Sequence, residues 1–305
     1  MQEYNKWIDR LPSGLRIRRL WATICAELSF PQGACAGHFY SPIPRREEIE
    51  HDQDRIFRQD IAQLPEIDLQ APAQFELLGR LAAHARSLDI SANATPGKRF
   101  HSANPYFYRA DALVLGSMLL EFKPRHYLEI GSGFSSALAL DVNDACLGGS
   151  VQFSFVEPSP TRLRLLINQR DGQTARIYVR RVQEVPDETF ASLEPNDFLF
   201  VDGSHVAKVG SDLNDVIFRI LPLLKPGVII HFHDIPWPFE YAKETVMRGT
   251  SWNETYILRA FLANNSKYQI LFFPSWLEKC HATAWHQAFS GIENIKVSSF
   301  WLRKV

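Results

Sequence analysis

The sequence predicts a doubly wound α/β fold in which seven strands form a mostly parallel sheet, preceded by an irregular, partly helical N-terminal extension. Three observations predict this fold. From about residue 108, short apolar runs alternate with stretches of helical periodicity. These helical stretches are long enough to cross over between parallel strands. A glycine-rich turn over 131–133 directly follows the first apolar run, at the place where such sheets bind ligands.

The same alternation gives each element its place along the chain. A helical pattern covers 75–85, and the segment 90–105, rich in Ser, Asn, Pro and Gly, predicts a loop. We therefore expect an extension over 1–104 that contributes to a ligand pocket, and an α/β domain over 105–305. The expected strands are 126–130, 151–157, 175–180, 198–202, 228–232, 268–273 and 296–304. The expected helices of that domain are 110–122, 137–144, 161–169, 213–224 and 252–264.

The composition is that of a folded protein and excludes several classes of partner. Hydrophobic residues make up 46% of the 305 residues, and the net charge is -1. A nucleic-acid-binding protein normally carries a basic excess or stripe, so we expect no nucleic-acid partner. No apolar stretch approaches the roughly 20 residues of a membrane span, and the four cysteines show no paired spacing. We expect a cytoplasmic protein without a membrane partner that acts on a small molecule, with homo-oligomer formation left open.

The residues that end the first two strands predict a cofactor site. Gly131 and Gly133 allow a positive φ and close approach of a ligand to the backbone, just before a helix N-terminus. A dinucleotide fingerprint would place a third glycine where Ser136 stands, so pyrophosphate binding is disfavoured. Glu129 suits a ligand with an ammonium or sulfonium group, and Glu157 can accept both hydroxyls of a ribose.

A second group of polar residues follows the fourth and fifth strands. Asp202 and His205 come after the fourth strand, and His233 and Asp234 after the fifth. Because parallel core strands end at one edge, we expect these side chains to converge there. Carboxylates and neutral imidazoles bind divalent cations, which can hold a substrate hydroxyl and lower its pKa, and His205 is then a candidate general base. We expect His231 to be a packing residue on the face opposite His233.

The segments LEIGSGFSS (128–136) and FVEP (155–158) resemble the first and second motifs of the class I S-adenosylmethionine-dependent methyltransferases. The resemblance implies that the glycine loop contacts the methionine and ribose parts of S-adenosylmethionine. It also implies that the acid after the second strand holds the ribose hydroxyls and that the segment after the third strand flanks the adenine. The cofactor-binding residues implied in this way are Glu129, Gly131, Ser132, Gly133, Ser135, Glu157, Gln183 and Asp202.

The segments VDGSH (201–205) and HFHDI (231–235) resemble the metal-dependent sugar O-methyltransferases of the mycinamicin and macrocin type, and more distantly catechol O-methyltransferase. The resemblance implies a divalent metal (Mg²⁺, Mn²⁺ or Fe²⁺) at Asp202, His233 and Asp234, and catalytic roles for His205 and Asp202. An imidazole in place of one acid favours Mn²⁺, Fe²⁺ or Zn²⁺ over Mg²⁺. Further segments, such as SWNETYILRAFL (251–262), resemble a widespread group of bacterial methyltransferase-like proteins.

The segment 235–256, rich in aromatic residues and proline, predicts a wall of the substrate pocket. The expected substrate contacts are Tyr108, Arg109, Trp237, Tyr241 and Trp252. We therefore predict a methyltransferase that methylates a hydroxyl of a small molecule, with metal assistance, in natural-product or sugar metabolism. The alternatives are N- or C-methylation, other metal chemistry on the same fold, a non-catalytic methyltransferase-like binding protein, or an NAD-dependent dehydrogenase.

Overall fold

The computed structural model describes residues 36–58, 60–290 and 296–305. The chain divides into two compact units, 1–56 and 57–305. Two helices, α3 (Arg46–His51) and α4 (Gln53–Ile56), belong to the first unit, and every other described element belongs to the second. Residues 57–104, which the sequence assigns to the N-terminal extension, thus lie in the same compact unit as the sheet.

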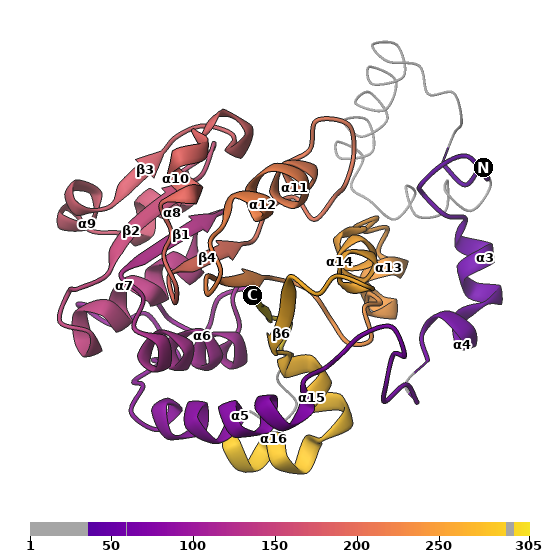
Figure 1. Cartoon of the computed structure of the whole chain (residues 1–305), viewed down its shortest axis with the longest axis horizontal. Coiled ribbons are helices and arrows are strands. Elements are labelled where there is room, and N and C mark those ends of the chain that lie inside the picture. Colours follow the sequence, from indigo (N-terminus) through magenta and orange to yellow (C-terminus); the bar gives the residue numbers. More distant parts are fainter. Residues whose placement is uncertain (1–35, 59, 291–295) are drawn as a thin grey trace, which may run out of the picture. The chain divides into compact units, whose positions relative to one another are not determined.

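A seven-stranded sheet forms the centre of the second unit, in the order β3-β2-β1-β4-β5-β7-β6 (Figure 1). The strands are β1 (His126–Ile130), β2 (Gln152–Val156), β3 (Arg176–Tyr178), β4 (Phe198–Val201), β5 (Ile229–Phe232), β6 (Tyr268–Phe272) and β7 (Phe300–Lys304). The first five strands pair in parallel, whereas β7 lies antiparallel between β5 and β6. The predicted mostly parallel, seven-stranded sheet is confirmed.

Helices cover both faces of the sheet, as crossover connections between parallel strands require. α5 packs on α6, which packs on α7, and Figure 1 shows α5 and α6 on one side of the sheet and α11 and α12 on the other. The longer helices are α5 (Ala71–Ala85), α6 (Arg109–Phe122), α7 (Phe134–Cys146), α14 (Glu254–Leu262), α15 (Pro274–Cys280) and α16 (Ala282–Ala288). The shorter ones are α8 (Thr161–Leu166), α9 (Gln169–Thr174), η1 (Val182–Glu184), α10 (Asp187–Ala191), α11 (Asp212–Asp215), η2 (Val216–Ile220), α12 (Leu221–Leu223) and α13 (Lys243–Met247). No helix in the described part of the chain is long and apolar enough to span a membrane.

The backbone hydrogen bonds between the central strands continue for one residue past the ends of the strands, so the carboxyl ends of these strands lie at one edge of the sheet. The N–H of Gly131 donates to the carbonyl of Val156 at 3.0 Å, and the N–H of Asp202 donates to the carbonyl of Ile130 at 2.9 Å. The N–H of His233 donates in the same way to Val201, also at 2.9 Å. Since β4 and β5 are fully buried, their polar ends mark where the apolar layers stop. The residues after β1, β2, β4 and β5 therefore lie side by side.

Candidate active site

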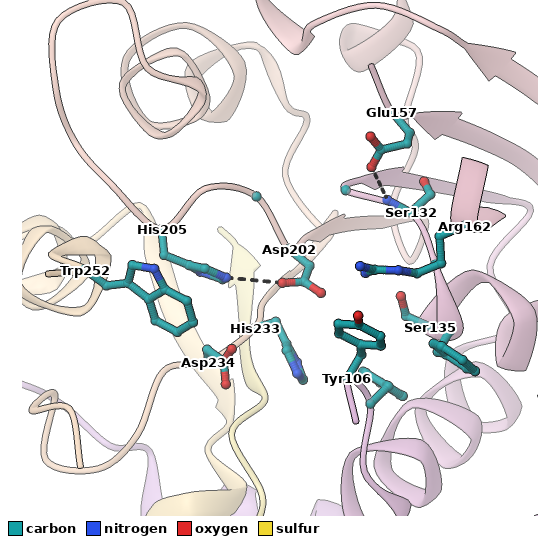
Figure 2. Close-up of a pocket in the computed structure, with 15 residues that line it drawn as sticks. Tyr106, Ser132, Ser135, Glu157, Arg162, Asp202, His205, His233, Asp234 and Trp252 are labelled. Atoms are coloured by element: carbon teal, nitrogen blue, oxygen red, sulfur yellow. Dashed lines mark hydrogen bonds and ion pairs between the residues drawn. The ribbon is translucent and has the colours of Figure 1, made fainter. Parts of the chain in front are cut away.

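A cavity of about 250 Å³ lies at this edge of the sheet, and Figure 2 shows the side chains that surround it. Its walls come from the ends of β1, β2, β4 and β5, from the segment before α6 and from the segment before α14. Ten residues that the sequence singles out line the cavity: Gly131, Ser132, Gly133, Ser135, Glu157, Asp202, His205, His233, Asp234 and Trp252. The convergence expected from parallel strand ends is thus present.

Close approach of two backbones explains the first glycine of the turn. Gly131 has a φ of +83°, in the left-handed region that favours glycine. A Cβ atom at this position would lie 1.8 Å from the carbonyl oxygen of Asp202. The ends of β1 and β4 can meet in this way only if residue 131 has no side chain.

Glu129 lies behind the glycine loop, where it binds the residues that follow the loop, and it does not line the cavity. Its carboxyl group is fully buried and accepts hydrogen bonds from the hydroxyls of Ser135 and Ser136, the latter at 2.7 Å. Burial raises the pKa of Glu129 to about 8, although the two serine hydroxyls act in the opposite direction. The structure therefore gives Glu129 a place behind the loop, where it holds the first turn of α7.

Glu157 is oriented at the rim of the cavity by backbone donors. One of its carboxylate oxygens accepts from the N–H of Ser132 at 3.2 Å (Figure 2). The other accepts from the N–H of Ser159 at 2.8 Å. Each oxygen keeps a free lone pair for a ligand, since a carboxylate oxygen can accept more than one hydrogen bond. This geometry suits a carboxylate that binds a diol.

His205 lies between two carboxylates. Its Nε2 atom is 3.3 Å from Oδ1 of Asp202, and its Nδ1 atom is 2.6 Å from Oε2 of Glu254. The imidazole is 6% exposed, and the indole of Trp252 lies 4.3 Å away between ring centroids. His205 has a φ of +59°, which is unusual for a residue other than glycine. Asp202, His205 and Trp252 line the cavity, and Glu254 lies behind them.

These two carboxylates determine the charge of His205. Burial lowers the pKa of an imidazole, but the hydrogen bonds with Asp202 and Glu254 outweigh that effect and raise the pKa of His205 to about 10. At neutral pH the ring is therefore an imidazolium in this arrangement. A base role belongs to its deprotonated form, which becomes more abundant as the pH rises.

The three predicted metal ligands line the cavity but have other partners. Asp202 faces the imidazolium of His205, while Asp234 accepts from the hydroxyl of Ser298 at 3.0 Å and lies 3.6 Å from Nζ of Lys296. Throughout the residues that the structure describes, no group of three His, Cys, Asp or Glu side chains is arranged to hold a metal ion. In this arrangement the predicted donors are therefore paired within the chain and are not gathered around one metal position.

The expected position of His231 was half right. The ring is buried and stacks on Phe200 with 3.9 Å between centroids, so its packing role is confirmed. It does not lie on the face opposite His233: its Nε2 atom is 3.3 Å from Nδ1 of His233. The expectation was wrong because successive side chains of a strand alternate between its two faces, so residues two apart, such as 231 and 233, lie on the same face. Burial lowers the pKa of His231 well below its usual value.

Several predicted ligand contacts lie away from the cavity. Gln183 donates from Nε2 to the carbonyl of Gly210 at 2.9 Å, and Arg109 donates from Nη1 to the carbonyl of Ile90 at 3.0 Å. Trp237 is buried, and its indole N–H donates to the carbonyl of Ile61 at 2.8 Å. Tyr241 packs behind Trp252 with 5.9 Å between ring centroids. Tyr108 precedes α6 and does not line the cavity either, so Trp252 is the one predicted substrate residue on its wall.

One wall contains a stack that the sequence did not point out. The guanidinium of Arg162 lies 3.7 Å above the ring centroid of Tyr106, which itself stacks on Phe134 at 6.0 Å. Arg162 is in the first turn of α8, so it follows the end of β2 as Glu157 does. Among the described residues that line the cavity, it is the only lysine or arginine. A signal was present in EPSPTR (157–162), where the arginine follows the strand-end acid by five positions.

Comparison with known proteins places the chain in a family. Residues 128–235 match the family described as Methyltransferase domain. An uncharacterised protein of Archaeoglobus fulgidus is 30% identical over 165 residues, which cover 52% of this chain and 73% of the relative.

Two solved methyltransferases also align with most of the chain. PaMTH1 of Podospora anserina, in complex with S-adenosylhomocysteine, is 16% identical, with 87% of this chain and 99% of that chain covered and a TM-score of 0.42. TomG of Streptomyces achromogenes, an O-methyltransferase of tomaymycin synthesis, is 15% identical, with 86% and 99% covered and a TM-score of 0.38. At these TM-scores the two structures carry no inference about this chain's substrate.

The domain match and the archaeal relative decide the assignment: the chain belongs to the methyltransferase-domain family, the class I S-adenosylmethionine-dependent methyltransferases that its motifs resemble.

Proposed function

We propose that this protein transfers a methyl group from S-adenosylmethionine to a hydroxyl of a small molecule. The observation that carries the proposal is the single cavity that joins the glycine loop and Glu157 to His205. The resemblance of VDGSH and HFHDI to sugar O-methyltransferases supports a sugar or natural-product hydroxyl.

The cavity offers partners for the ribose, the sulfonium and the methionine carboxylate of the cofactor. Glu157 is oriented to accept the ribose hydroxyls, and the backbone of the glycine loop at 131–133 lies beside it. The carboxylates of Asp202 and Asp234 line the same cavity, where they can lie beside the sulfonium. Arg162 offers the cation that the methionine carboxylate needs on this otherwise acidic wall. When bound, S-adenosylmethionine supplies a methyl group on a positively charged sulfur.

His205 is the base of the proposed reaction. Glu254 accepts from Nδ1, so Nε2 is the nitrogen that faces Asp202 and the cavity. The deprotonated ring takes the proton of the acceptor hydroxyl, and the resulting imidazolium is stabilised by the two carboxylates. Because the pKa of His205 is raised to about 10, the base form is the minor form at neutral pH. The rate of transfer should therefore increase with pH up to about 10.

The proposed transfer uses the chain's own charges: His205 lies 3.3 Å from Asp202, and Lys296 lies 3.6 Å from Asp234. We therefore expect S-adenosylmethionine binding to be unchanged after dialysis against a chelator. Binding that disappears on chelation and returns with Mg²⁺ or Mn²⁺ would restore the metal-assisted mechanism.

Titration calorimetry with S-adenosylmethionine tests the proposal directly. The wild-type protein should bind one equivalent, and Glu157→Gln should weaken binding about 10- to 150-fold, because a charge-assisted hydrogen bond contributes roughly 1.5–3 kcal/mol. Glu188→Gln, on the exposed surface of α10, is the matched control and should bind as the wild type does. A protein that binds no S-adenosylmethionine would contradict the proposal.

A further inference from the structure

The turn that begins α14 is docked onto the loop that carries His205. The backbone N–H groups of Asn253 and Glu254 both donate to the carbonyl of His205, at 3.1 and 3.2 Å. The side chain of Asn253 binds Ala207 twice: its Oδ1 accepts from the N–H at 2.6 Å, and its Nδ2 donates to the carbonyl at 3.2 Å. Four hydrogen bonds thus join two segments that lie almost fifty residues apart.

This docking coincides with a backbone conformation that needs support. His205 has a φ of +59°, in the left-handed region, which is unfavourable for a residue that has a side chain. Strained residues of this kind persist where the surrounding structure determines them, and they are frequent at active sites. The hydrogen bonds from residues 253 and 254 end on the carbonyl of the strained residue itself, so the turn holds that conformation.

The imidazole is held from two further directions. Glu254 is 2% exposed, and its carboxylate lies 2.6 Å from Nδ1. A carboxylate buried to this extent is costly unless it has a charged partner, and His205 provides that partner. The indole of Trp252 lies beside the imidazole of His205, with 4.3 Å between the two ring centroids. Trp252 and His205 line the cavity, whereas Asn253 and Glu254 do not, so these two residues act from behind.

We propose that Glu254, with Asn253, is a positioning residue for the reaction: it fixes the proton on Nδ1 of His205, so that Nε2 points at Asp202 and the acceptor site. The proposal rests on the proposed function, since it assigns to His205 the role of base. It adds that a buried glutamate on a separate helix, without contact to the cavity, determines which nitrogen performs that role.

Nuclear magnetic resonance of protein with ¹⁵N-labelled histidine tests the proposal without a known acceptor. The wild type should show a hydrogen-bonded Nδ1 proton for His205, assigned by its loss in His205→Asn. Glu254→Gln retains an oxygen acceptor and should keep that proton signal, whereas Glu254→Ala should lose it. Glu240→Gln is the matched control, because Glu240 is a half-buried glutamate of the same region that accepts from Tyr256 instead of a histidine.

Two further measurements separate the outcomes. Calorimetry with S-adenosylmethionine should give an unchanged dissociation constant for Glu254→Gln and Glu240→Gln, because neither residue lines the cavity. Thermal unfolding establishes which variants fold; if Glu254→Ala does not, Asn253→Ala replaces it and should broaden or shift the same proton signal. An Nδ1 proton that is unaltered in folded Glu254→Ala or Asn253→Ala would overturn the positioning role. Wild-type protein that binds no S-adenosylmethionine would instead overturn the proposed function.

Discussion

At the scale of single residues, the substitution of Gly131 by alanine has the most specific expected effect on stability and on cofactor binding. Gly131→Ala should lower the free energy of unfolding by about 2 kcal/mol or more, because the new methyl group would both strain the backbone and collide with Asp202. S-adenosylmethionine affinity should fall with it. Gly97→Ala is the matched control: its φ is +85°, but no atom lies within 4 Å of the added Cβ. Urea unfolding of both variants measures the difference, and equal losses would contradict the close approach.

Arg162 is expected to recognise a carboxylate. Arg162→Met should weaken S-adenosylmethionine binding about tenfold, the loss of a charge-assisted contact of roughly 1.4 kcal/mol. Adenosine, which has no carboxylate, should bind equally well to wild type and variant. Arg164→Met, two residues along the same helix and outside the cavity wall, should behave as wild type in calorimetry. An equal loss for adenosine would show that Arg162 acts on the nucleoside instead.

The charge of His205 gives a pH-dependent contribution to stability. A pKa raised from 6.5 to about 10 means that the folded state holds this proton more tightly than the unfolded state. The resulting stabilisation is fully present below about pH 6.5 and is lost as the pH rises to 10. The difference in melting temperature between wild type and His205→Gln should therefore shrink between pH 6.5 and 10. A constant difference across this range would contradict the paired imidazolium.

Residues at strand ends were predictable from the sequence, whereas residues on connecting segments were not. Asp202 and His233 follow apolar runs directly, so the strand periodicity alone places them at the edge of the sheet. Trp237 and Gln183 lie on connections whose course is determined by tertiary packing, and both point elsewhere. Arg162 was overlooked because a basic residue in a first helical turn is normally solvated.

At the scale of elements, Arg99 lies in the connection between α5 and α6 and joins this connection to two other helices. Its guanidinium is 8% exposed and binds Asp141 of α7 and Asp171 of α9. Arg99→Met removes the cationic partner of these carboxylates and should lower the free energy of unfolding by about 3–5 kcal/mol. Lys98→Met is the control, since its partner Asp89 is largely exposed and the pair contributes about 0–1 kcal/mol. Chemical denaturation measures both, and similar small losses would contradict the joining role.

Element boundaries were predictable to different degrees. The first strand was expected at 126–130 and is observed there, because a short apolar run between Pro124 and Gly131 leaves little choice. The single helix expected over 213–224 is instead divided into α11, η2 and α12, and Pro222, which lacks an N–H donor, lies in the last of these. The position of β7 between β5 and β6 follows from tertiary pairing and has no signal in the sequence.

At the scale of the whole molecule, the second unit contains everything that the proposed site requires. Its hydrophobic core, as far as the structure describes it, runs from Leu64 to Leu302, and the cavity is lined by residues between Tyr106 and Trp252. The predicted division at residues 104 and 105 would separate α5 from this core, although Leu77 and Leu81 of that helix are buried in it. The unit that folds by itself should therefore begin near residue 57.

We accordingly expect a fragment of residues 57–305 to unfold cooperatively and to bind S-adenosylmethionine as the full chain does. A fragment of residues 105–305 should fail to fold, because removing α5 exposes the apolar face of α6 against which it packs. Circular dichroism melting and calorimetry on both fragments measure the two expectations. If the shorter fragment folded and bound the cofactor, residues 57–104 would be a separable extension, and the boundary predicted from the loop composition at 90–105 would be correct.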